Sequence, residues 1–173
     1  MDPLLARRVA DVQSSVIRDL LSIVDAHDVL SLAGGLPPSE LLPDDAVAEA
    51  SARVLGRRGA LQYGPTEGYD PLRDWIAGDR LGGVDRAGVL VTHGSQQALD
   101  LLVRVLVDPG DVVVTETPTY LGMLQALGGS GARIVGVSTD ADGLDAEELE
   151  AALAEGLRPK LAYLAPTHQN PSG

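Results

Sequence analysis

The sequence predicts an α/β protein with three layers, in which a mainly parallel sheet has helices on both faces. From Gly88 onward, short β-like apolar runs alternate with segments whose apolar residues recur at helical spacing. Strands separated by helices of this length need right-handed crossovers, which build a parallel sheet. Ligands of such sheets bind beyond the carboxyl ends of the strands, and two polar motifs of this chain are expected there.

The individual elements follow from apolar spacing and from turn residues. In the first half, the spacing predicts a helical arm, a strand and two further helices, over residues 3–25, 29–32, 43–58 and 71–81, in that order. Gly and Pro mark residues 61–69 as a loop. In the second half we expect strands over residues 89–92, 112–115, 133–137 and 160–164, and helices over residues 95–107, 120–127 and 145–155.

Composition narrows the function classes. The 173 residues are 45% hydrophobic and 22% charged, which suits a soluble globular protein that buries roughly 70% of its unfolded surface. Without cysteine, disulfides and cysteine metal sites are excluded. A net charge of −12 argues against nucleic acid as a partner, and no apolar run is long enough for a membrane. No targeting segment is evident, so we expect a cytoplasmic protein.

Gly94-Ser95-Gln96 opens a predicted helix directly after a predicted strand. The first helical turn presents N–H groups and a partial positive charge, and glycine lets a phosphate approach closely. A dinucleotide fingerprint and a Walker A sequence are both absent, which leaves a monophosphate as the specific ligand. The alternative is that Ser95 is simply the N-cap of the helix.

Two further polar positions follow predicted strands. Tyr120, after Glu116-Thr117-Pro118-Thr119, can lay its ring over a flat heteroaromatic ligand, or it packs the start of its own helix. Pro171 biases the preceding Asn170 toward an extended backbone, which fixes the direction of its side-chain amide. The alternative is that Asn170 is simply a turn residue. His93 and His168 flank these positions but lack carboxylates at metal-binding spacing, so no metal site is expected.

Five motifs in order resemble the class I/II aminotransferases, which are fold-type-I enzymes dependent on pyridoxal 5′-phosphate (PLP), and among them the 2-aminoadipate aminotransferase and MocR-like branch. The motifs cover residues 31–37, 63–73, 94–100, 116–120 and 166–173. The resemblance implies the large domain of that fold in truncated form. With a composition change near residue 84, it implies an N-terminal arm and small-domain or interface segment over residues 1–83. Residues 84–173 would then be the first part of the PLP-binding domain.

The resemblance also implies roles for single residues. Gly94, Ser95 and Gln96 would hold the PLP phosphate, Tyr120 would stack on the pyridine ring and Asn170 would hydrogen-bond the 3′ oxygen. Tyr63 would reach the phosphate of a partner subunit across a dimer interface. Four further positions would line the substrate side, namely Gly34 and Gly35 in a loop and Ser15 and Arg18 on the first helix.

In the family, the Schiff-base lysine, the aspartate on the ring nitrogen and the arginine for the substrate carboxylate would all lie beyond Gly173. We therefore expect no catalytic residue in this chain. Its only lysine, Lys160, lies at the start of the last predicted strand, which is the wrong end for the cofactor.

The expected function is amino transfer from an amino acid to a 2-oxo acid, in a homodimer or together with a complementing C-terminal-half subunit, and the chain alone would be inactive. The alternatives are another PLP-dependent reaction (lyase, decarboxylase or cyclase), a non-catalytic PLP-binding regulatory module, and a decayed fragment that binds nothing.

Overall fold

The computed structural model describes Leu4, Ala6 and residues 37–173, which belong to two compact units. We call Leu36–His93 the helical unit and Gly94–Gly173 the sheet unit, and each is described by itself. The predicted helix over residues 3–25 and strand over 29–32 lie outside the described residues, as do Ser15, Arg18, Gly34 and Gly35. The predicted domain change near residue 84 stays a prediction.

The helical unit contains η2 (Ser39–Leu41), α2 (Asp44–Leu55), α3 (Asp70–Trp75), the π-helical η3 (Ile76–Arg80) and η4 (Arg86–Gly88). Asp44 and Asp45 lie in the first turn of α2, where acidic side chains face the positive helix end. Pro71 lies in the first turn of α3, where its missing N–H costs no hydrogen bond. Both predicted helices and the loop between them are confirmed.

The predicted strand over residues 89–92 is wrong. These residues are extended, yet they join no sheet in the part of the chain that the structure describes. Their backbone groups have other partners: the Val91 N–H donates to the Glu67 carbonyl (2.9 Å), and the Val89 carbonyl accepts from Nε of Arg73 (2.8 Å). A loop carbonyl and a side chain therefore provide hydrogen bonds that the prediction assigned to a strand neighbour.

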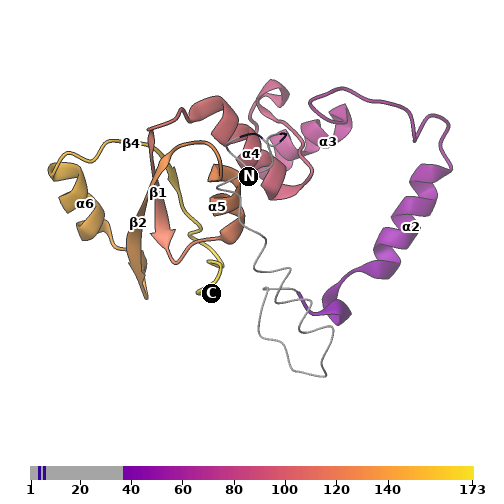
Figure 1. Cartoon of the computed structure of the whole chain (residues 1–173). Coiled ribbons are helices and arrows are strands. Elements are labelled where there is room, and N and C mark those ends of the chain that lie inside the picture. The colour runs from indigo at the N-terminus through magenta and orange to yellow at the C-terminus, as the bar shows by residue number, and fades with distance from the viewer. Residues whose placement is uncertain (1–3, 5, 7–36) are drawn as a thin grey trace. The chain divides into compact units, whose positions relative to one another are not determined.

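The sheet unit has the predicted layers (Figure 1). Its strands are β1 (Val112–Thr117), β2 (Arg133–Asp140), β3 (Gly143–Leu144) and β4 (Pro159–Tyr163), in the order β3-β2-β1-β4. β1 pairs in parallel with β2 and with β4, while the short β3, which the sequence did not predict, is antiparallel to β2. α4 (Gly94–Leu106) and α5 (Leu121–Leu127) cover one face, and α6 (Ala146–Ala154) covers the other.

The core of the sheet unit lies between β1 and the two helices α4 and α5. It is formed by Val103, Val113, Met123, Ala126 and Leu127, with Leu99, Val107, Leu161 and Tyr163 packed around them. β1 is buried on both faces, as expected for a central parallel strand. Burial of each large side chain contributes about 1.5–3 kcal/mol, so this cluster fixes the sheet against α4 and α5.

The side chain of Asp145 caps the start of α6. The Asp145 carboxylate accepts from the N–H groups of Glu147 (3.0 Å) and Glu148 (2.9 Å), which satisfies two donors of the first turn. None of the helices over the described residues has the length and apolar character that crossing a bilayer requires.

Candidate functional site

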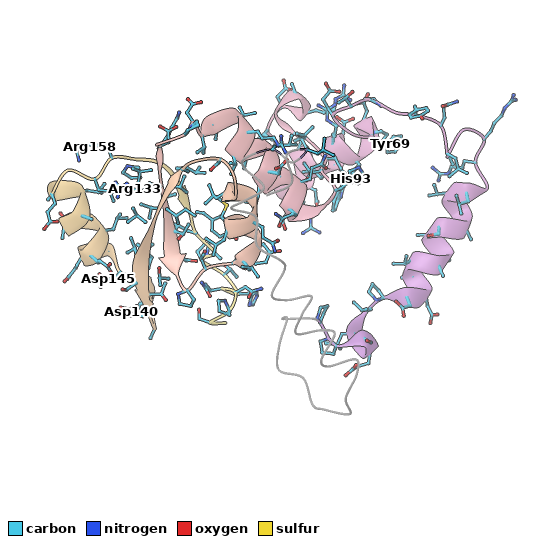
Figure 2. The ribbon with its side chains drawn as sticks, viewed as in Figure 1. Tyr69, His93, Arg133, Asp140, Asp145 and Arg158 are labelled. Carbon is cyan, nitrogen blue, oxygen red and sulfur yellow. The ribbon has the colours of Figure 1, made fainter. Side chains whose placement is uncertain are left out.

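The carboxyl ends of the strands identify the edge of the sheet where a site is expected. Arg133 and Asp140 mark the two ends of β2 (Figure 2), and Asp140 is at the carboxyl end. Glu116 lies near the carboxyl end of β1, and residues 164–173 follow β4 at the same edge. The structure thus brings together the motifs over 116–120 and 166–173, as the parallel sheet predicted.

A buried carboxylate joins these two motifs. Glu116 is only 4% exposed, and its Oε2 accepts from the Ala165 N–H (3.1 Å) and from Nε2 of Gln169 (3.3 Å). The same Gln169 nitrogen donates to the Pro118 carbonyl (2.7 Å). The sequence analysis assigned no role to Glu116 or Gln169, although they lie in the motifs over residues 116–120 and 166–173.

The start of α4 meets the start of α5 through Gln96 and Gly122. Nε2 of Gln96 donates to the Gly122 carbonyl (2.9 Å). A Cβ added to Gly122 would lie 2.3 Å from Cε1 of Tyr120 and 2.5 Å from Oε1 of Gln96, so only glycine fits between them. Gly122 was not predicted as a site residue. The only feature of the sequence that could have indicated it is its position two residues after Tyr120.

The first turn of α4 combines a glycine with two exposed polar residues. Gly94 has a positive φ of 73°, and a Cβ built on it would meet no described atom within 4 Å. Ser95 and Gln96 are exposed in the first turn of a 13-residue helix. Backbone N–H groups and the helix dipole both favour a phosphate at such a terminus.

Two polar side chains near this edge have no hydrogen bond within the described residues. Thr119 has a buried Oγ1 with no partner, directly before Tyr120. Asn170 is exposed, and no hydrogen bond to its side-chain amide occurs in the described residues. A buried hydroxyl without a partner is costly, and a ligand group or a water molecule bound beside it would remove that cost.

Tyr163, the last residue of β4, adds a phenol to the same edge. Burial, together with the nearby Tyr120 and Glu116, raises its pKa above the ordinary value of 10.0. Tyr163 is therefore a neutral hydroxyl at physiological pH and acts as a hydrogen-bond donor or acceptor. Sequence reasoning treated it only as part of an apolar strand.

A cleft of about 310 Å³ also opens at this edge, on the side of β3. Its polar lining is formed by Glu116, Thr139, Asp140, Asp142, Gln169 and Ser172. Three carboxylates repel a phosphate, and neither the first turn of α4 nor Tyr120 lines this cleft. The cleft is therefore not the phosphate site.

Lys160 lies at the opposite edge of the sheet, as predicted. Pro159 is paired with Val112 at the start of β1, and the Lys160 ammonium lies 2.7 Å from Oδ2 of Asp111 and 3.6 Å from Oδ2 of Asp108. The hydrogen bond that Lys160 donates to Asp111 raises the pKa of the lysine above its ordinary 10.5, so the amine stays protonated and paired.

Of the remaining predicted site residues, only Tyr63 belongs to the part of the chain that the structure describes. Tyr63, in the helical unit, is 99% exposed. His168 has a positive φ of 52°, and no cluster of three His, Cys, Asp or Glu side chains suited to a metal ion occurs among the described residues.

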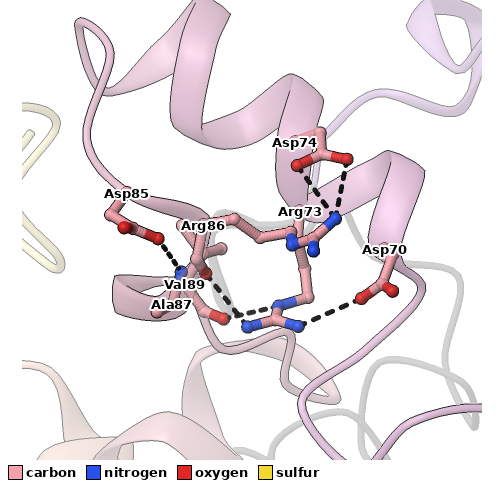
Figure 3. Close-up of polar contacts among 7 residues, drawn as sticks. All are labelled: Asp70, Arg73, Asp74, Asp85, Arg86, Ala87 and Val89. Carbon is pink, nitrogen blue, oxygen red and sulfur yellow. Dashed lines mark hydrogen bonds and ion pairs between the residues drawn. The ribbon is translucent and has the colours of Figure 1, made fainter.

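The helical unit has one buried polar cluster, centred on Arg73 (Figure 3). Arg73 is 8% exposed and donates to the carbonyls of Val89 (2.8 Å) and Arg86 (3.0 Å) and to Oδ1 of Asp70 (3.2 Å). Arg86 in turn pairs with Asp74. These contacts tie α3 to the extended segment that leads toward Gly94.

Comparisons with known proteins place these features in a wider context. The family model for "Aminotransferase class I and II" matches residues 27–173. The chain is 46% identical to the 2-aminoadipate transaminase of Thermus thermophilus, over 94% of this chain and 41% of that protein. It is 39% identical to aromatic-amino-acid aminotransferase 1 of Thermococcus litoralis, over 97% of this chain and 43% of that protein.

A solved structure is similar over the same range. The crystal structure of the alpha-aminoadipate aminotransferase from Thermus thermophilus, complexed with N-(5′-phosphopyridoxyl)-L-leucine, matches with a TM-score of 0.86 and 44% identity. The match covers 98% of this chain and 42% of that chain. The chain thus spans less than half the length of the relatives it matches.

Proposed function

Because this chain belongs to the class I and II aminotransferase family, we propose that it provides the cofactor-binding part of a PLP-dependent aminotransferase. The reaction would move an amino group from an amino acid to a 2-oxo acid. The observation that carries this proposal is the meeting of Gln96, Tyr120 and Gly122, which brings an aromatic ring to the first turn of α4.

The residues of this edge fit the cofactor in charge and in hydrogen-bonding capacity. The first turn of α4, with the exposed Ser95, supplies donors for a phosphate dianion. Tyr120 offers an aromatic face to a planar ring. Thr119 and Asn170 have polar groups without described partners, which suits a ligand with a polar rim.

PLP, when bound, acts as the electron sink for bonds at the Cα of the amino acid. The residues of this chain would bind and orient it. Ser95 and the backbone amides of α4 would hold the phosphate, while Gln96, which donates to the Gly122 carbonyl, would fix the start of α5. Tyr120 would set the tilt of the ring, and the Asn170 amide would donate to its 3′ oxygen.

The amine that binds the cofactor covalently would come from outside this chain. Lys160 is the only lysine of the sequence, and it is paired with Asp111 at the opposite edge. We propose that a complementing C-terminal portion or subunit supplies that lysine. Tyr63 would reach the phosphate of a partner subunit, and Ser15, Arg18, Gly34 and Gly35 would contact the substrate.

PLP titration of the purified chain tests this proposal. Tyr120→Ala and Ser95→Ala should each weaken PLP binding about tenfold, since each removes one contact worth about 1–2 kcal/mol. Tyr69→Ala and Ser51→Ala are matched controls on exposed residues of the helical unit and should leave the affinity unchanged. Equal affinities in all four variants would contradict the proposed site.

A further inference from the structure

Glu116 is a buried acid whose charge is met by hydrogen bonds and not by a cation. In the part of the chain that the structure describes, no lysine or arginine forms an ion pair with it. A buried carboxylate without a cation is costly unless donors compensate it. Its Oε2 accepts from the Ala165 N–H and from Nε2 of Gln169, and both donors belong to the segment after β4.

Gln169 uses both ends of its amide. Nε2 donates to Glu116 and to the Pro118 carbonyl, which fixes the side chain against the end of β1. Oε1 accepts from the Ser172 N–H (2.8 Å) and from the Ser172 hydroxyl (2.6 Å). Two donors and two acceptor positions are then occupied, which is the full capacity of a glutamine side chain.

These contacts anchor the residues on both sides of Asn170. Its neighbour Gln169 is fixed to β1, and Ser172 is fixed to Gln169, so Asn170 and Pro171 form a short bridge between two anchored points. The Gly173 N–H also donates to the Gln169 carbonyl (2.7 Å), which closes the turn. The Asn170 side chain itself is exposed and bonds no described residue, so its direction depends on this turn.

We infer that Glu116 and Gln169 are positioning residues that aim the Asn170 amide at the cofactor ring. The inference rests on the proposed function, because it needs a ring with a 3′ oxygen at this edge. Neither residue would touch the cofactor: Glu116 would hold the Gln169 side chain, and Gln169 would hold the turn that carries Asn170.

Gln169→Glu is the most informative single change, because it keeps the shape and the acceptor for Ser172 but removes the amide donors. It also brings a second carboxylate to Glu116, and like charges at hydrogen-bond distance repel. The double variant Glu116→Gln with Gln169→Glu exchanges the two groups, so a donor again faces a carboxylate. Asp142→Asn is the matched control: it removes a carboxylate from the lining of the same cleft, but one that bonds nothing in the turn.

Two measurements on the whole chain separate positioning from folding. Amide hydrogen exchange without ligand should become about tenfold faster or more for Ala165 and Ser172 in Gln169→Glu, because the turn loses its hydrogen bonds to the Glu116 carboxylate and to the Pro118 carbonyl. In titrations, PLP should bind about tenfold more weakly, while inorganic phosphate should bind as before, since its site on α4 is intact. The exchanged pair restores the contact between residues 116 and 169 but gives the Pro118 carbonyl no donor, so it should recover part of both effects. Asp142→Asn should show neither effect.

The inference is overturned if Gln169→Glu leaves exchange in residues 165–173 unchanged, or if PLP and phosphate lose affinity equally. An exchanged pair that restores slow exchange without restoring PLP binding also overturns it. If the unmodified chain binds neither PLP nor phosphate, the proposed function fails instead, and the exchange rates alone then decide whether Glu116 and Gln169 hold the turn.

Discussion

The two units of this chain are stabilised in different ways. The sheet unit has an apolar core in which Val113 and Met123 are almost completely buried. In the helical unit, α2 has no buried residue, and Leu61 and Tyr63 are largely exposed. Its buried side chains are those of Ala77, Val89 and Arg73, and Arg73 is a cation bound to two backbone carbonyls. Core packing therefore holds the sheet unit, and a polar cluster organises the helical unit.

The largest effect should follow from removing core volume in the sheet unit. Met123→Ala should lower the free energy of unfolding by about 2–5 kcal/mol, because it removes buried apolar surface and leaves a cavity. Leu61→Ala, at a side chain 87% exposed in the helical unit, should change it by less than about 0.5 kcal/mol. Urea unfolding of both variants measures the contrast, and comparable losses would show that the two units share one core.

The polar cluster of the helical unit should be sensitive to the shape of its cation. Arg73→Lys keeps the charge but loses the fork that reaches Val89, Arg86 and Asp70, and should cost about 1.5–3 kcal/mol. Arg53→Lys, in an exposed ion pair with Glu49, should cost less than about 0.5 kcal/mol. Hydrogen exchange at the Val91 amide is the direct readout, and an unchanged rate in Arg73→Lys would contradict the role of the cluster.

Two glycine-to-alanine changes, one in each unit, should have different effects on stability. Gly122→Ala should cost about 1–3 kcal/mol and weaken PLP binding, since the new methyl group would collide with Tyr120 and Gln96. Gly78→Ala in the helical unit meets no described atom within 4 Å and should be neutral or stabilising by about 0.4–1 kcal/mol. Thermal unfolding compares them, and a harmless Gly122→Ala would show that α4 and α5 do not meet as described.

The smallest effect should come from the ion pair at the amino edge of the sheet. The hydrogen bond from Lys160 lowers the pKa of Asp111 below its ordinary 3.8, so this stabilisation is present above that pH and is lost as the pH falls through the lowered value. The pKa of Lys160 is raised above 10.5, so stabilisation is lost again as the pH rises through the raised value. Lys160→Met should lower the melting temperature slightly between these two pH values, so that its decline toward either extreme becomes less steep. An unchanged pH profile would show that the pair contributes nothing.

Sequence patterns predicted the sheet unit well because its elements depend on local apolar periodicity. The strands and helices over residues 95–164 were found within a few residues of their observed ends, apart from the two-residue β3. The strand over residues 89–92 was wrong for a physical reason: an apolar run predicts extended backbone but not its partners, and here Arg73 and Glu67 are the partners.

Candidate site residues could be predicted from the sequence only where the residue type and its place in a motif indicate a chemical role. Ser95, Tyr120 and Asn170 could be selected from their places at helix starts and strand ends. Glu116 and Gln169 could not, because their importance comes from a contact across 53 residues of sequence that only the register of β1 and β4 creates. Gly122 was missed for the same reason, since its close neighbours lie on α4 and before α5.

We propose that this chain binds PLP by its phosphate and ring, and that Lys160 does not bind the cofactor covalently. The most direct test is to titrate the purified chain with PLP, reduce it with borohydride and locate any adduct by mass spectrometry. We expect saturable binding that is competed by phosphate, with no adduct on Lys160. An adduct on Lys160, or no saturable binding at all, would contradict it.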